Sequence, residues 1–186
     1  MSLQRVHYAD AKGFTLLELL VTLAIAGILS TMAISAFQNS IAQNRITTEL
    51  TQLKNDFVFA GSEALRTGLP VTVCSTSDGS SCSQSTSWNT GWIVFDDPAS
   101  ALQTSSNTVI VRKQSSLTDG DNITADNSIS TVAYNRQGFV NNIATSISTV
   151  TFTDHAASPS SGTTQCLTMT FLGQLGFESS GQGNCQ

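Results

Sequence analysis

The sequence predicts an α+β fold, in which one long N-terminal helix packs against antiparallel strands. Two observations support this fold class. Residues 14–67 contain no proline and only two glycines, and apolar side chains recur at helical spacing along the second half of that stretch. After Pro70 the chain changes to short β-branched and aromatic runs between clusters of Asn, Ser, Gly and Asp, which is typical of strands and turns.

The first 37 residues form a polar leader followed by an apolar run. The leader, residues 1–13, contains Arg5 and Lys12, and the apolar run, residues 14–37, is long enough to cross a bilayer as a helix. One carboxylate, Glu18, lies inside this run at the fifth position after Gly13. A carboxylate in lipid costs ~2.5–3.5 kcal/mol, so it needs a partner. Cleavage after Gly13 would create one, the free amine of Phe14.

Two other interpretations of the apolar run stay open. In the first, the run is an ordinary secretory signal peptide with an apolar core at 16–29 and a small-residue cleavage site at 31–33. In the second, it is a plain single-pass anchor. Glu18 argues against both, because neither an export signal nor an anchor gains from a charge in its apolar core.

Residues 38–67 are predicted to continue the same helix as an amphipathic segment. Apolar residues recur there at spacings of three and four with charged residues between them, which indicates one buried stripe against a soluble domain. Gly68 and Pro70 predict the end of the helix, which would be ~80 Å long if it began at residue 14. The residues of the stripe are Ile46, Leu50, Leu53, Phe57, Ala60 and Ala64.

Residues 68–186 are predicted to form a β-rich globular domain. Trp88 and Trp92 are expected to be core aromatics without a ligand. Asp119-Gly120-Asp121-Asn122 is similar to a calcium loop but lacks the downstream acidic ligand, so a turn is expected, with a calcium role as the alternative. Strands are expected at 71–74, 91–96, 108–112, 128–135, 147–153 and 165–171, and long loops at 75–87, 98–107, 118–127 and 156–162.

All four cysteines follow the apolar run, which favours an oxidising compartment. Four cysteines allow three connectivities. We favour Cys74–Cys82 and Cys166–Cys185, because the members of each pair are near in sequence and are flanked by turn-forming residues. A zinc site is the rival interpretation, but the chain has no C-x-x-C pair and only His155 as a histidine after the leader.

The glycine, the aromatic residue after it, the apolar run and the carboxylate at that offset resemble the type III signal of type IV pilins and pseudopilins. The resemblance implies that a prepilin peptidase cuts after Gly13 and methylates the amine of Phe14. It also implies that Glu18 then pairs with the N-terminal amine of a neighbouring subunit. Many major pilins have a proline where this chain has Ser35, so local melting of the helix is less expected here.

Three further segments resemble the GspH/FimT/FimU pilin group, and FimU-type minor pilins most of all. They are the helix-to-strand junction at 60–74, the Trp-x-x-Gly-Trp strand at 88–96 and the strand-turn element at 134–139. The resemblance implies a helix packed on two antiparallel sheets. It also implies, as partners, other minor and major pilins, the prepilin peptidase and an inner-membrane assembly platform.

Three functions compete within this group: a minor pilin of the type IV pilus that primes assembly at the tip, a minor pseudopilin of type II secretion, and a DNA-uptake pilin. The DNA receptors carry a basic C-terminal tail, whereas residues 137–186 here contain no Lys or Arg. From residue 14 onward the chain has six basic residues and twelve acidic ones, so nucleic-acid binding is not expected. The disulfides and the Ser/Thr-rich loops favour the pilus.

Composition and motifs favour a structural role over an enzymatic one. The chain has no G-x-S-x-G nucleophile motif, phosphate loop or dinucleotide fingerprint, and no cofactor is expected. The basic residues Arg5 and Lys12 predict that the leader stays inside and the domain outside the inner membrane before assembly. After assembly the protein is expected on the pilus at the cell surface.

Overall fold

The computed structural model describes residues 13–105, 108–117, 120–157 and 163–185, without the side chains of residues 32–36. The predicted leader therefore lies outside the described residues except for Gly13. The chain divides into two compact units, Met1–Gln38 and Asn39–Gln186.

One helix, α1 (Leu16–Thr67), contributes residues to both units. It begins two residues after the predicted start and ends at the predicted residue. Gly68 adopts the left-handed conformation (φ 67°), and its N–H donates to the carbonyl of Ala64 at 3.0 Å, which closes the last turn. Within the part of the chain that the structure describes, we find no helix with both the length and the apolar character needed to cross a membrane.

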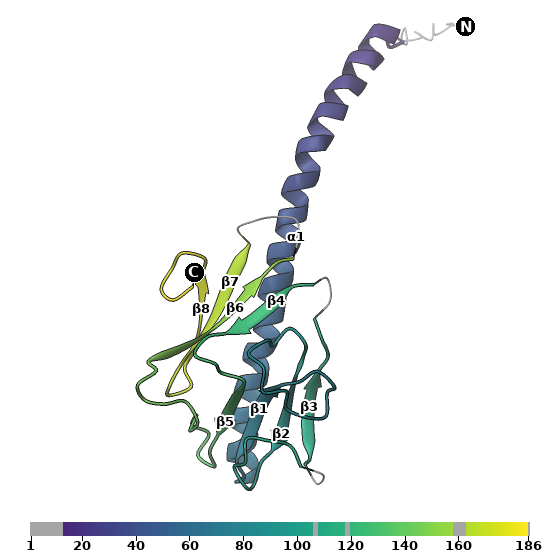
Figure 1. Ribbon diagram of the computed structural model, residues 1–186. Coiled ribbons are helices and arrows are strands. Elements are labelled where there is room, and N and C mark those ends of the chain that lie inside the picture. The colour runs from purple at the N-terminus through teal and green to yellow at the C-terminus, as the bar shows by residue number, and fades with distance from the viewer. Residues whose placement is uncertain (1–12, 106–107, 118–119, 158–162, 186) are drawn as a thin grey trace, which may run out of the picture. The chain divides into compact units, whose positions relative to one another are not determined.

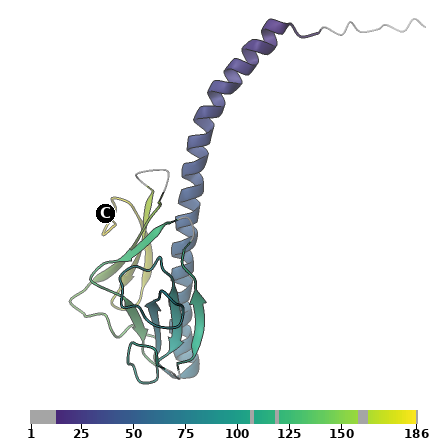
Figure 2. The same cartoon turned by 45° about the vertical axis from the view of Figure 1, so that its right-hand side comes forward.

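The second unit contains two four-stranded antiparallel sheets that lie along the second half of α1 (Figures 1 and 2). This arrangement confirms the predicted α+β class with two sheets. The first sheet has the order β3-β2-β1-β5, with β1 Val71–Ser75, β2 Trp92–Asp96, β3 Ile110–Gln114 and β5 Thr131–Tyr134. The second has the order β4-β6-β7-β8, with β4 Asn122–Ala125, β6 Thr149–His155, β7 Thr164–Thr170 and β8 Leu175–Ser179.

Two strands were not predicted. Strand β4 lies inside the expected loop 118–127, where it pairs with β6 over four residues. Strand β8 pairs with β7 in a segment for which no element was expected. Both strands lie at an edge of the second sheet, and each carries only two apolar side chains that alternate with polar or glycine residues.

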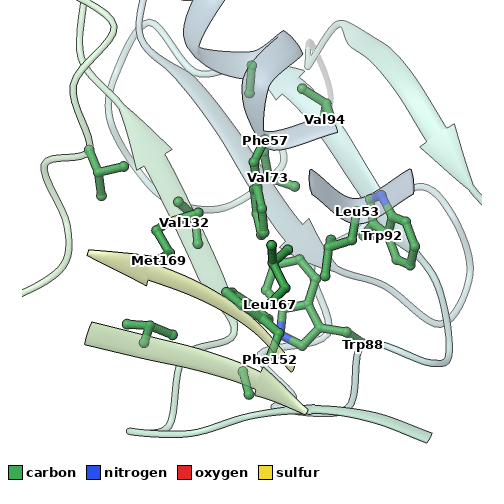
Figure 3. Packing of buried hydrophobic residues seen from close by; sticks show 14 of the residues in the cluster. Leu53, Phe57, Val73, Trp88, Trp92, Val94, Val132, Phe152, Leu167 and Met169 are labelled. Carbon is green, nitrogen blue, oxygen red and sulfur yellow. The ribbon is translucent and has the colours of Figure 1, made fainter. Parts of the chain in front are cut away.

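The core lies between the second half of α1 and the two sheets. All six residues of the predicted helical stripe are fully buried, which confirms that prediction. Phe57 lies at the centre, with its ring 5.8 Å from Trp88 and 5.1 Å from Phe152 between ring centroids (Figure 3). Both tryptophans are fully buried, as expected of core aromatics. The same cluster includes Val73 and Val94 of the first sheet and Leu167 and Met169 of the second.

Each of the two disulfides links a strand of one sheet to a segment outside the strands, and the two disulfides lie in different sheets. The structure joins Cys74 to Cys82 and Cys166 to Cys185, which is the pairing favoured from the sequence. Cys74 packs with Ile93 and Phe95 in a second, smaller apolar cluster, so the disulfide loop helps to cover the face of the first sheet that points away from α1. The other disulfide holds the segment after β8 against β7.

Candidate processing and assembly site

The predicted processing site lies where the chain enters α1. Gly13, Phe14 and Thr15 are not helical, and the helix begins at Leu16. The hydroxyl of Thr15 accepts a hydrogen bond from the backbone N–H of Glu18 at 3.2 Å, which makes Thr15 the N-cap residue. The bond between Gly13 and Phe14 is therefore in non-helical backbone, and Phe14 is 80% exposed.

Glu18 occupies the first turn of α1. A carboxylate in that position is stabilised by the partial positive charge of the helix N-terminus. Phe14, Glu18, Leu19 and Thr22 line one shallow depression, so the residue that would carry the new amine lies on the same face as the carboxylate. Among the residues that the structure describes, Glu18 has no side-chain ion pair.

The described surface of α1 around and after Glu18 in the first unit is mostly apolar. Exposed apolar surfaces of this extent are typical of sites that contact other proteins or membranes. The hydroxyls on this surface bond to the helix backbone, as Thr22 does to the Leu19 carbonyl at 2.9 Å and Ser30 to the Ala26 carbonyl at 2.7 Å. Apart from Glu18, the surface therefore offers apolar contact. The exposed large residues are Leu16, Leu17, Leu19, Leu20, Val21, Leu23, Ile25, Ile28, Leu29 and Phe37.

The second unit carries three acidic residues on α1 at seven-residue spacing: Glu49, Asp56 and Glu63, each 7% exposed. Asp56 accepts hydrogen bonds from the indole N–H of Trp92 at 2.8 Å and from Arg112 at 2.9 Å. Glu63 accepts two hydrogen bonds from Arg66, one of them at 2.8 Å, and these bonds hold the pKa of the Glu63 carboxyl below its usual value. The burial of this acidic row was not predicted, although its seven-residue period is visible in the sequence.

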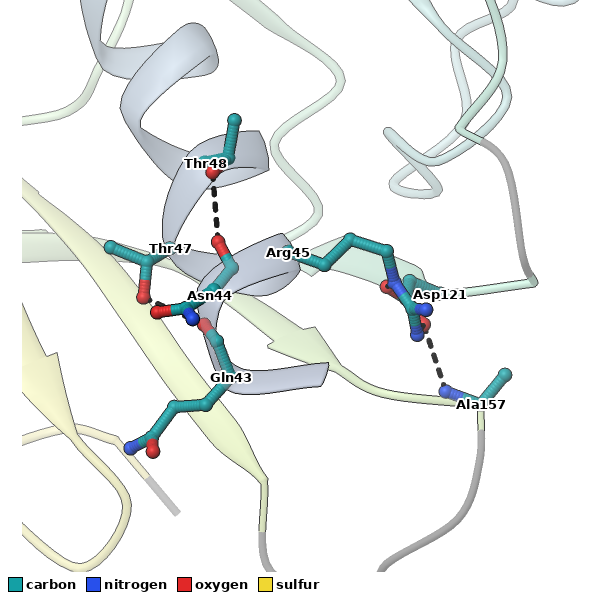
Figure 4. Close-up of polar contacts among 7 residues, drawn as sticks. All are labelled: Gln43, Asn44, Arg45, Thr47, Thr48, Asp121 and Ala157. Atoms are coloured by element: carbon teal, nitrogen blue, oxygen red, sulfur yellow. Dashed lines mark hydrogen bonds and ion pairs between the residues drawn. The ribbon is translucent and has the colours of Figure 1, made fainter. Parts of the chain in front are cut away.

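Asp121 has a different role from the turn residue that was expected. It is 1% exposed, and both its carboxylate oxygens accept hydrogen bonds from Arg45 of α1 (Figure 4). The backbone N–H of Ala157 adds a third bond at 3.0 Å. Asn122 begins strand β4, and Asp119 lies outside the described residues. Within the described ranges no group of three or more acidic, histidine or cysteine side chains has the arrangement of a metal site.

Most of the basic side chains in the second unit contact acidic or aromatic groups of the same unit. Arg45 and Arg66 pair with carboxylates as described above. Arg112 also lies over the ring of Phe59, at 3.8 Å from the ring centroid, and the Lys54 amine lies 4.7 Å from the ring centroid of Phe177. These contacts engage four of the six basic residues of the second unit.

Comparisons with known proteins match both units. The family described as type II transport protein GspH matches residues 49–173, and the prokaryotic N-terminal methylation motif matches residues 9–34. Among solved structures, a crystal structure of the type IV minor pilin FimU of Pseudomonas aeruginosa strain PAO1 has a TM-score of 0.55 at 15% identity, covering 73% of this chain and 89% of FimU. A second crystal form of FimU has a TM-score of 0.52 at 15% identity, covering 71% of this chain and 91% of FimU.

The FimU structures share the fold of this chain, in which a long N-terminal helix packs on two antiparallel sheets. The methylation motif spans Gly13, Phe14 and Glu18, and the GspH match spans more than half of the 186 residues. The chain therefore belongs to the type II transport protein GspH family, and it is a type IV pilin-like protein of the GspH/FimU type.

Proposed function

We propose that this protein is a minor type IV pilin that is incorporated into the pilus and promotes its assembly as part of a priming or tip complex. The observation that carries the proposal is the first turn of α1. There the exposed Gly13–Phe14 bond precedes a single carboxylate, Glu18, in an otherwise uncharged, largely apolar segment at the start of the helix. The FimU-like fold of the second unit supports the choice of a minor pilin.

In the proposed mechanism, the precursor waits in the inner membrane as a single-pass protein with its second unit outside. A prepilin peptidase cuts after Gly13 and methylates the amine of Phe14. Glu18 of an incoming subunit and the N-terminal ammonium of its neighbour then satisfy each other, which removes the cost of an isolated charge in an apolar surrounding. The apolar helix passes from lipid to filament core without exposure to water, and the assembly platform and the sibling pilins are its partners.

The test is the replacement Glu18→Ala in the full-length precursor. The variant should insert into the membrane and be processed normally, because its helix becomes more apolar. Its share in sheared pili, measured by quantitative immunoblotting against the membrane fraction, should fall at least tenfold. Thr22→Val is the matched control, since Thr22 lines the same depression and its hydroxyl only bonds to the helix backbone. Normal amounts of Glu18→Ala in the pili would contradict the pairing role.

The alternative is a minor pseudopilin of type II secretion, which the description of the matching family favours. Deletion of the gene distinguishes the two functions. Loss of twitching motility with normal exoenzyme secretion supports the pilus, and the opposite result supports secretion.

A DNA-uptake pilin is the third candidate. Its marker would be a DNA mobility shift at low salt, which the pairing of Arg45, Arg66 and Arg112 with carboxylates disfavours.

A further inference from the structure

Two acidic side chains meet inside the second unit, where helix α1 packs on strand β6. Asp154 of β6 is fully buried, and neither of its carboxylate oxygens has a hydrogen-bond donor in the described part of the chain. Its acidic neighbour on the helix side is the Glu49 carboxylate of α1, which is itself only 7% exposed. Two ionised carboxylates can only accept hydrogen bonds, so a bond between them requires that one carries a proton.

The surroundings do not supply enough positive charge to keep both groups ionised. Asp121, in the segment before β4, is the third carboxylate that acts on Asp154, and Arg45 of α1 is the cation that opposes them. The Arg45 guanidinium is engaged in two hydrogen bonds with Asp121 (Figure 4). The residues that pair with Asp154 in the sheet, Ile123 of β4 and Gln165 of β7, are uncharged. Three buried carboxylates with one guanidinium would leave uncompensated charge in a low-dielectric interior.

We propose that Asp154 and Glu49 hold one proton between them, and that the resulting carboxyl–carboxylate hydrogen bond fastens α1 to the second sheet in a pH-dependent way. The pair thus acts as a clamp that is closed at mildly acidic and neutral pH and weakened at alkaline pH. This clamp goes beyond the proposed role in assembly, because it concerns how the second unit holds its own helix.

The direction of the pH dependence follows from the protonation of Asp154. Burial, together with the charges of Glu49 and Asp121, raises the pKa of Asp154 from 3.8 to about 8. Between these values the folded chain keeps a proton that the unfolded chain releases, so stability falls as the pH rises through this window. One proton changes the unfolding equilibrium constant by up to about tenfold per pH unit. The pair therefore stabilises the fold most fully at the acidic end of the window and loses that contribution near pH 8.

The experiment is urea unfolding of the full mature chain in non-ionic detergent between pH 5 and pH 9, followed by the fluorescence of the buried Trp88 and Trp92. The wild-type unfolding constant should increase by a factor of ten or more across this range. Asp154→Asn places a permanent amide donor opposite Glu49. The variant should lose most of this pH dependence and exceed the wild type in stability at pH 9.

Glu49→Gln is a second variant with the same expected result, and it keeps the test available if Asp154→Asn does not fold. Asp126→Asn is the matched control, because Asp126 accepts a hydrogen bond from the Thr151 backbone N–H instead of meeting a second acid. It should keep the wild-type pH dependence. The proposal is overturned if wild-type stability is flat or rises between pH 5 and pH 8, or if both amide variants keep the wild-type dependence.

Discussion

Replacement of Asp56 by alanine tests how helix α1 is held against the first sheet. Asp56 is 7% exposed, and its two carboxylate oxygens accept hydrogen bonds from different groups. One comes from the indole N–H of Trp92 at 2.8 Å and the other from Arg112 at 2.9 Å. Alanine removes both acceptors at once and leaves the fully buried Trp92 without its partner.

The expected loss of stability follows from the two bonds. A buried donor left without an acceptor costs about 1–3 kcal/mol. The Arg112 side chain is 46% exposed, so its ion pair with Asp56 contributes only about 0–1 kcal/mol. The two contributions together predict a decrease of about 1–4 kcal/mol in the free energy of unfolding, compared with the roughly 5–15 kcal/mol that is typical of a folded domain.

The assay is urea unfolding of the mature chain, followed by tryptophan fluorescence, in a double-mutant cycle. Asp56→Ala should cost much less in a Trp92→Phe background, because phenylalanine has no N–H to leave unpaired. Arg112→Ala is the control for the exposed half of the bridge and should cost about 1 kcal/mol. The reasoning is refuted if Asp56→Ala costs under about 1 kcal/mol, or if it costs the same in both backgrounds.

Two further predictions concern the core and the C-terminus. Phe57→Ala should lower the free energy of unfolding by about 3–5 kcal/mol in the same assay, because it leaves a cavity beside the rings of Trp88 and Phe152. A loss below about 1.5 kcal/mol would contradict the described packing. Replacement of Cys166 and Cys185 by serine should lower the free energy of unfolding by about 3 kcal/mol and make the residues after β8 accessible to carboxypeptidase. Unchanged stability together with continued protection from carboxypeptidase would contradict a structural role for this disulfide.

The helix and most of the first sheet could be predicted because each depends on local sequence patterns. The stripe on α1 follows one helical period, and Gly68 with Pro70 marks the end of the helix. Strand β2 is a nearly continuous apolar run, and β1 alternates its two valines with a polar residue before Cys74; both patterns indicate a strand. The edge strands β4 and β8 lack this signal, since their pairing with β6 and β7 is determined by tertiary structure.

In the candidate site, too, features that depend on local sequence could be predicted, whereas those that depend on tertiary contacts could not. Gly13, Phe14 and Glu18 could be proposed from the sequence, because they lie within six consecutive residues and their spacing resembles the type III signal of pilins. The partners of Asp121 and Asp154 could not be identified, because Arg45 and Glu49 lie far from them in sequence and meet them only after the sheet has formed. A row of acidic residues on one helix face predicts buried partners but does not reveal which strands supply them.

The central claim is that cleavage after Gly13 frees the amine that Glu18 needs. Mass spectrometry of the protein purified from pili tests this claim most directly. We expect the mature polypeptide to begin at Phe14 with one methyl group on its terminal nitrogen. A mature polypeptide that begins at any other residue, or that keeps its leader within the filament, would contradict the account.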